Sequence, residues 1–392
     1  MGLCLAILPS CRSTPVTIRA GLLLDGRGGQ MRDALITVVK DRIRTVGPWQ
    51  GTPVTHDLSR FSVLPGLIDA HVHITGYFNR LGKIHTRDDG ETAAQRDAGR
   101  AANALATLRA GFTTVASMGS EGDKELRNRI EKGSIPGPRI LTSLAQFRDT
   151  SLSPAQLRRA VRNRKAAGAD FIKVFASNAM QQGGTPVFSP EQLEALCGEA
   201  RRIGLPSVVH AMSDASLRRV SDAGCSTVEH GSFGTAEGLG VLADRGLFFD
   251  PQCRLVVDNY LENWSRFAGG AGFDTTTFAV LQQSRPTDPL LIRTALAVPG
   301  LRLLFGSDAV AGAHGRNADD LICRVREAGQ DPMDALVTAT SRNAEALGLG
   351  GEIGRIAPGY QADLIALDGN PLREIEAVLR VRLVMKGGKI VR

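Results

Sequence analysis

Six side chains that can bind metal ions stand at or near the ends of short apolar segments in this 392-residue chain. Imidazole nitrogens and carboxylate oxygens are common protein ligands of zinc and other divalent first-row metals. The residue types therefore indicate metal-dependent chemistry if the fold brings the side chains together. The six are His71, His73, Lys173, His210, His230 and Asp308.

The histidines occur as one close pair and two single residues. His71 and His73 are separated by one residue, so in a strand both side chains point to the same side and can hold one ion. A structural alternative stays open, because imidazoles are often satisfied by hydrogen bonds near strand ends. His210 and His230 each end a short β-rich run and supply further neutral nitrogens suited to zinc, manganese or cobalt.

Lys173 lies in the apolar segment FIKVFAS, where an unpaired ammonium would be costly to bury. One interpretation is an exposed strand end or a buried ion pair. The other is reaction with CO2, which gives an anionic carbamate whose two oxygens can bridge two divalent metals. Burial favours the neutral amine that this reaction needs. Asp308, in FGSDA, is either a helix N-cap or a metal ligand that also shuttles protons.

The elements that position these residues follow a repeated βα pattern. Apolar β-rich runs alternate with amphipathic helical stretches such as PEQLEALCGEARRIG and DASLRRVSDAG. Eight parallel strands close into a TIM barrel, whose active sites lie at the C-terminal ends of the strands. One metal site there explains all six residues with a single assumption. The eight runs are GLIDAHVHI, FTTVASMG, PRILTSLA, DFIKVFAS, SVVHAM, STVEHG, LFFDPQ and RLLFGSDA.

The two ends of the chain have a different sequence pattern from the middle. Residues 15–62 and 353–392 contain short alternating segments broken by Gly, Pro or Asp, and the GG in VRLVMKGGKIV is typical of a hairpin turn. We predict an α/β fold, with a (β/α)8 TIM barrel over residues 63–352 and a small β-sandwich-like module built from both termini. Residues 1–14 form a tail or the remnant of a lipoprotein signal ending at Cys11, without its charged front part.

Composition narrows the function classes. The net charge of +7 comes from dispersed basic residues, as on one predicted helix face that carries Arg158, Arg162 and Lys165, so we expect no nucleic-acid partner. No stretch approaches the roughly 20 apolar residues of a membrane span. The six cysteines show no CxxC pair and are interpreted as ordinary buried thiols. We expect a small-molecule substrate and a possible homo-oligomer, in the cytoplasm or, if Cys11 is lipidated, anchored to the membrane in the periplasm.

The order HxH, Lys, His, His, Asp, within LPGLIDAHVHI, FIKVFAS, VVHAM, VEHG and FGSDA, resembles the binuclear branch of the amidohydrolase superfamily. The resemblance covers nearly the whole chain, including GFTTVASMG, GPRI and the tail from ATSRNAEALGLGGEIGRIAPGYQADLIALDGNP to VMKGGKIV. Within the superfamily the chain is similar to the prolidase-like members, metal-dependent peptidases and aminoacylases acting on Xaa-Pro or other acylated amino acids. The resemblance implies a hydrolase that cleaves an amide bond in a dipeptide or an N-acyl amino acid.

The resemblance also implies two divalent ions, with zinc the default and manganese or cobalt as alternatives. A hydroxide shared by the ions would attack the carbonyl, and Asp308 would pass its proton to the leaving amine. Three alternatives stay open: ester, lactone or phosphotriester hydrolysis at the same site, a mononuclear deaminase or imidazolone-type ring hydrolase, and a noncatalytic barrel scaffold. The implied ligands are His71, His73 and Asp308 for the first ion, His210 and His230 for the second, and carboxylated Lys173 as the bridge.

The loops around the predicted site depart from the family pattern. Many dipeptide-cleaving members carry His-Gly-Asp after the third strand and a tyrosine just beyond the sixth-strand histidine, whereas this chain has LAQFRDTS and Phe233. Candidate substrate contacts are Asn259, Tyr260, His314 and Arg316, in the loops after the seventh and eighth strands. The guanidinium of Arg316 would suit a substrate carboxylate. Ordinary polar loop residues remain the alternative for each.

Overall fold

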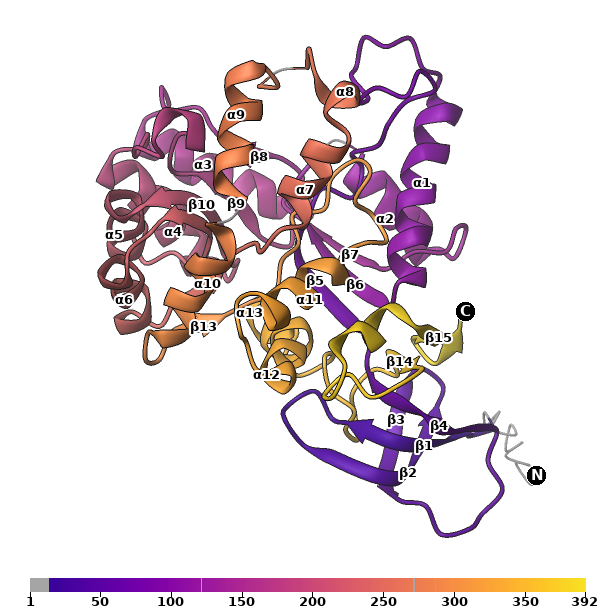
Figure 1. Cartoon of the computed structure of the whole chain (residues 1–392). Helices are drawn as coiled ribbons and strands as arrows, with labels where there is room; N and C mark the ends of the chain where they lie inside the picture. Colours follow the sequence, from indigo (N-terminus) through magenta and orange to yellow (C-terminus); the bar gives the residue numbers. More distant parts are fainter. Residues whose placement is uncertain (1–13, 121, 271, 286) are drawn as a thin grey trace, which may run out of the picture.

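The computed structural model describes residues 14–120, 122–270, 272–285 and 287–392. Cys11 lies outside these ranges, so its lipidation stays a prediction. The chain alternates strands and helices through its middle and has strands at both ends (Figure 1). The strands are β1 Val16–Leu24, β2 Gln30–Val39, β3 Arg42–Pro48, β4 His56–Pro65, β5 Leu67–Val72, β6 Phe112–Ser117, β7 Arg139–Thr142, β8 Gln146–Phe147, β9 Ile172–Phe175, β10 Ser207–Ser213, β11 Thr227–Phe233, β12 Phe248–Asp250, β13 Arg302–Leu303, β14 Leu364–Leu367, β15 Val381–Lys386 and β16 Lys389–Ile390.

The α-helices follow the barrel strands in sequence and cover them from outside. Several begin with a serine or threonine cap, and α4 has the full capping box of Ser189 and Gln192 with Pro190 in its first turn. The predicted helical segments 190–204 and 214–224 correspond to α4 and α5. The helices are α1 Ala93–Arg109, α2 Asp123–Glu131, α3 Pro154–Ala166, α4 Pro190–Arg202, α5 Asp214–Asp222, α6 Ala236–Asp244, α7 Leu255–Glu262, α8 Trp264–Phe267, α9 Thr275–Ser284, α10 Asp288–Ala297, α11 Ala318–Arg326, α12 Pro332–Val337 and α13 Asn343–Ala346.

The eight predicted runs contain strands β5, β6, β7, β9, β10, β11, β12 and β13, and all of these pair in parallel. All six residues of β5 and all six of β6 are buried. Strands covered on both faces must be apolar almost throughout, which is why each appears in the sequence as a continuous apolar run. The short strand β8, which pairs with β9, was not predicted.

Backbone hydrogen bonds close the barrel between its first and last strands. The N–H of Asp308 donates to the carbonyl of His71 at 2.8 Å, and the N–H of His73 donates to the carbonyl of Ala309 at 2.8 Å. A parallel bridge joins Val72 to Ala309 beside these bonds. Closure therefore places His71, in β5, and His73, just after it, directly next to Asp308.

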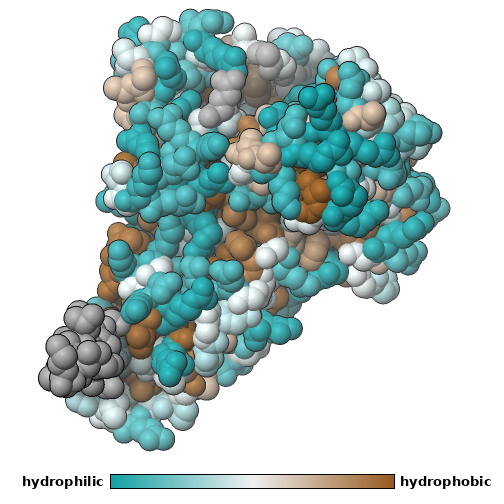
Figure 2. All heavy atoms as spheres, turned by 180° about the vertical axis from the view of Figure 1, so that it is seen from behind, coloured by the Kyte–Doolittle hydropathy of each residue, from teal (hydrophilic) through white to brown (hydrophobic). Residues whose placement is uncertain are grey.

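A second sheet combines strands from both ends of the chain, in the order β16-β15-β14-β4-β1-β2-β3. Strands β15 and β16 are joined by Gly387 and Gly388, whose φ angles of 55° and 73° are the left-handed values that a tight hairpin requires and glycine adopts freely. Figure 1 shows this sheet beneath the barrel, with the C-terminus beside it. Figure 2 shows apolar side chains gathered where the sheet meets the barrel. The chain division at residues 14, 62 and 352 stays a prediction.

The interpretation of the cysteines as ordinary thiols was wrong for four of the six, and Cys4 and Cys11 lie outside the described residues. Cys197 in α4 forms a disulfide with Cys225, and Cys253 forms one with Cys323 in α11. The partners are 28 and 70 residues apart, so no short spacing in the sequence reveals the pairing. Among the described residues, no helix is long and apolar enough to cross a membrane.

Candidate metal centre

The six predicted ligand residues line one cavity with a volume of about 740 Å³. They come from separate parts of the barrel wall and meet at the ends of its strands, as a shared C-terminal mouth requires. Their positions are His71 in β5 and His73 just after it, Lys173 in β9, His210 in β10, His230 in β11, and Asp308 after β13.

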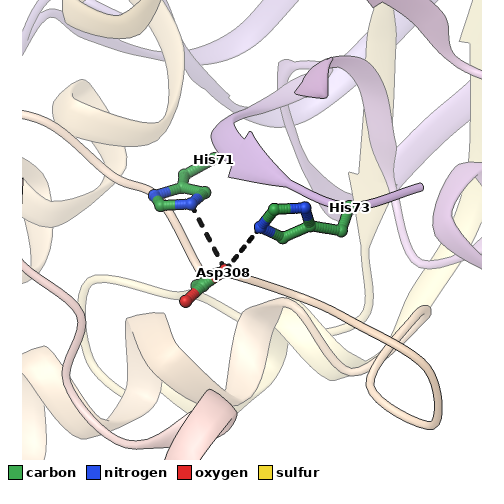
Figure 3. Close-up of side chains that lie close together, drawn as sticks. All are labelled: His71, His73 and Asp308. Carbon is green, nitrogen blue, oxygen red and sulfur yellow. Dashed lines mark ion pairs between the residues drawn. The ribbon is translucent and has the colours of Figure 1, made fainter. Parts of the chain in front are cut away.

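The tightest group is formed by His71, His73 and Asp308. The Nε2 atoms of His71 and His73 lie 3.3 and 3.2 Å from the same oxygen, Oδ1 of Asp308 (Figure 3). This oxygen is buried and has no hydrogen-bond partner within the described chain. Two imidazole nitrogens and a carboxylate oxygen thus converge on a small volume, which is the arrangement of a metal-binding triad.

The rings of His210 and His230 lie beside this group. Their centroids are 4.6 Å apart, and the His230 ring is 5.2 Å from that of His71. Burial lowers the pKa of His210 to about 3 and that of His71 to about 4, and it holds the pKa of His230 well below its usual value. These imidazoles are therefore neutral at physiological pH, the form that binds metals.

Lys173 is 1% exposed, and its amine donates a hydrogen bond to Oε2 of Glu229. Burial lowers the pKa of Lys173 to about 7. The other oxygen of Glu229 lies 3.0 Å from Nδ1 of His71. Glu229, itself 0% exposed, connects the lysine to the first histidine. The structure thus shows the buried ion pair, and the carbamate stays a prediction.

Sequence reasoning missed Glu229 although it precedes His230 directly in VEHG. In a regular strand neighbouring side chains point to opposite faces, so only one of the two would be expected in the site. His230 has a φ of 69°, a left-handed conformation that breaks the alternation and lets both side chains approach His71. Asp308 is similar, with a φ of 51°. Left-handed non-glycine residues are uncommon and cluster at functional sites.

Two further buried polar residues follow β11 in the barrel order. Asp250, at the end of β12, has an oxygen 3.8 Å from Nδ1 of His71, and burial raises its pKa to about 8. Gln252 lies within 3.5 Å of the same nitrogen. Both lie in the predicted strand LFFDPQ. The aspartate at the end of this strand was the feature of the sequence that could have identified them as site residues.

The predicted substrate contacts divide into two groups. Tyr260 lines the cavity. His314, whose Nε2 lies 3.2 Å from the carbonyl of Gly76, and Arg316, which pairs with Glu262 and Asp319, are absent from the cavity lining. Asn259 is fully buried, and its side chain donates a hydrogen bond to the carbonyl of Ala311.

The donor set fits divalent cations. Neutral imidazoles and an ionised carboxylate are the protonation states that coordination requires. Burial opposes ionisation of Asp308, but the imidazoles of His71 and His73 outweigh this and keep its pKa well below the usual value. The buried Nε2 of His210 also has no hydrogen-bond partner among the described residues. Such unpaired buried groups are costly unless a ligand satisfies them.

A closed parallel barrel with histidines and an aspartate at one mouth defines a class of metal-dependent barrel hydrolases. The sequence matches the amidohydrolase family over residues 62–391, and the chain belongs to that family. It is a hydrolase acting on carbon–nitrogen bonds, and the family generally uses divalent metals.

Individual relatives agree with this assignment. Ochratoxinase of Aspergillus niger is 28% identical over 437 aligned positions, which cover 98% of this chain and 88% of ochratoxinase. A solved Xaa-Pro dipeptidase with methionine bound in its active site is 25% identical, has a TM-score of 0.85, and matches over 97% of this chain and 100% of its own. Imidazolonepropionase of Cereibacter sphaeroides is 27% identical over 93% of this chain and 97% of its own. The prolidase-like resemblance is confirmed.

Proposed function

We propose that this protein hydrolyses an amide bond in a dipeptide or an N-acyl amino acid at a centre of two divalent metals. The convergence of all six ligand residues on one cavity supports this proposal most directly. The curated relative and the structural neighbour are named as an ochratoxinase and a Xaa-Pro dipeptidase, respectively. Zinc is the default metal for a set rich in histidine.

The residues present account for the parts of the reaction that a protein supplies. His71, His73 and Asp308 would hold one ion, and His210 with His230 the other. Two divalent ions held there would lower the pKa of water toward neutrality and polarise the scissile carbonyl. Asp308, with an unpaired oxygen in the cavity, would accept the proton of the attacking water and deliver it to the leaving nitrogen.

Lys173 would bridge the two ions after reaction of its amine with CO2. The amine lies in the cavity wall, beside Glu229 and close to His71, and burial favours its neutral form. After carboxylation the nitrogen still carries one hydrogen, so Glu229 can keep accepting from it while the new carboxylate turns to the metals. The pair seen in the structure is therefore compatible with the carbamate.

The test is a substrate screen together with metal analysis. We expect Xaa-Pro dipeptides or N-acyl amino acids to be cleaved in the presence of zinc, manganese or cobalt, with about two ions bound per chain. Lys173→Ala should abolish turnover and most metal binding, whereas Lys124→Ala, at an exposed lysine of α2, should change neither. Near wild-type turnover of Lys173→Ala would overturn the bridging role.

A mononuclear ring hydrolase is the second candidate, and the similarity to imidazolonepropionase favours it over the remaining alternatives. The two candidates differ in metal content and in the lysine. One ion per chain, full metal binding by Lys173→Ala and opening of an imidazolone ring would select the ring hydrolase. Two ions and cleavage of an acyclic amide would exclude it.

A further inference from the structure

A second cavity, of about 860 Å³, shares His73 and Arg148 with the cavity of the metal centre. Its described lining residues include four arginines, and a guanidinium suits a carboxylate through a bidentate contact. Arg148 is the one arginine among the described residues that line the first cavity. The arginines that line the second cavity are Arg87, Arg96, Arg100 and Arg148.

Arg148 is held in a fixed orientation. Its guanidinium carbon lies 3.3 Å from the ring centroid of Phe175, and its Nε donates to Oε1 of Gln146 at 2.8 Å. Gln146 is itself anchored, since its amide donates to the carbonyl of Met118 at 2.9 Å. The two terminal nitrogens of Arg148 have no acidic partner in the described part of the chain. The residue thus presents a free, oriented donor pair to the cavity.

This donor pair is close to the chemistry. The Phe175 ring also stacks on His210, with centroids 4.8 Å apart, so the guanidinium and a metal-ligand ring contact the same phenyl group. In an amino-acid amide, three bonds separate the carboxyl carbon from the amide carbonyl carbon, a span of at most about 4 Å. A bidentate arginine–carboxylate contact then needs nitrogen–oxygen distances of about 2.8 Å. A substrate amide placed beside His210 can therefore bring its carboxylate to Arg148.

We propose that Arg148 binds the free α-carboxylate on the amine side of the scissile amide. This inference rests on the proposed amide hydrolysis and adds that substrates whose α-carboxylate is amidated or esterified are poorly bound. It gives Arg148 the role that the sequence suggested for Arg316, whose guanidinium is engaged by Glu262 and Asp319. Much of the remaining cavity wall is apolar and suits an apolar side chain, through residues such as Met212, Val256, Val257, Phe273, Leu281 and Leu291.

The experiment compares N-acetyl-L-methionine with N-acetyl-L-methioninamide, which differ only in the carboxylate, by measuring acetate release from the zinc-loaded enzyme. Arg148→Met keeps a side chain that can pack on Phe175 and removes the charge. We expect it to lower kcat/KM for the acid roughly tenfold or more, chiefly through KM, and to leave the amide unchanged. Arg148→Lys should recover part of the loss. Arg158→Met, on the outer helix α3, is the matched control and should behave as wild type.

Binding is measured separately by titrating L-methionine and L-methioninamide into the zinc-loaded protein in a calorimeter. Weaker binding of the acid alone to Arg148→Met supports the inference. Equal losses for acid and amide, or no loss for the acid, overturn it. If the wild-type enzyme releases acetate from neither compound and cleaves nothing in the wider screen, the proposal of amide hydrolysis is wrong. The calorimetric comparison still decides whether Arg148 binds a carboxylate.

Discussion

Replacing Glu229 by glutamine is expected to weaken metal binding while preserving the volume of the side chain. Glu229 accepts a hydrogen bond from Lys173 with one oxygen, and its other oxygen lies 3.0 Å from Nδ1 of His71. A carboxylate oxygen this close to Nδ1 favours the tautomer of His71 that carries its proton on Nδ1, which leaves the Nε2 lone pair free on the side of Asp308. Glutamine accepts at one end only, so its NH2 group must face either the lysine amine or the His71 nitrogen.

The size of the effect follows from these contacts. Losing the partner that orients a metal-binding histidine typically costs 10- to 100-fold in metal affinity. We therefore expect Glu229→Gln to raise the Kd for zinc about 10- to 100-fold, or about 1.4–2.7 kcal/mol. Glu229→Ala should be more severe, because it also leaves the buried amine of Lys173 without a partner. Breaking a buried ion pair in this way costs about 3–5 kcal/mol of stability in the metal-free protein.

Zinc affinity is measured by competition with a chromophoric chelator, and stability by thermal melting of the metal-free protein. Glu199→Gln is the matched control. Glu199 lies on the outer helix α4, is 5% exposed, and pairs with Arg162 of α3 and Arg202 of α4. The control should lose no zinc affinity. Wild-type zinc affinity in Glu229→Gln would show that Glu229 does not orient His71, and the reasoning would be refuted.

Three further outcomes are expected. Removing metal with a chelator should stop turnover, and adding zinc back should restore it. Burial raises the pKa of Asp288 from 3.8 to about 8, so the folded protein loses stability as the pH rises through this window and the carboxyl group gives up its proton. The melting temperature of Asp288→Asn relative to wild type should therefore increase between pH 4 and 8. Reduction of the denatured chain should expose four more thiols than denaturation alone, as counted with a thiol reagent.

The barrel and its candidate ligand residues could be predicted from the sequence because each produces a pattern among residues that are neighbours in the chain. Strands such as β5 and β10 are buried on both faces and are therefore apolar over most of their length, and His71 and His210 interrupt these runs in the second half of β5 and in the middle of β10. The position of a residue along such a run is enough to place it at the barrel mouth.

Contacts that depend on two distant segments were not accessible in this way. The disulfide of Cys253 and Cys323 and the pairing of Lys173 with Glu229 join residues far apart in sequence. Arg148 stands in LAQFRDTS, a segment that the sequence marked only as a departure from the family pattern; its role depends on packing against Phe175.

The disulfides bear on the location of the protein. Such bridges persist in oxidising compartments and are rare in the cytosol of mesophiles. The pairs Cys197–Cys225 and Cys253–Cys323 therefore favour the periplasmic alternative over the cytoplasmic one.

Burial gives the donors of this site the charge states that metal binding requires. Desolvation penalises the charged form of every group, so it keeps the imidazoles of His71 and His210 neutral and lowers the pKa of Lys173 to about 7. The same effect raises the pKa of Asp250 to about 8. The pKa of Asp308 falls in spite of burial, because the rings of His71 and His73 lie against its carboxylate. Burial of these side chains thus prepares neutral nitrogens, an amine that can react with CO2 and one anionic oxygen, the combination that two cations would complete.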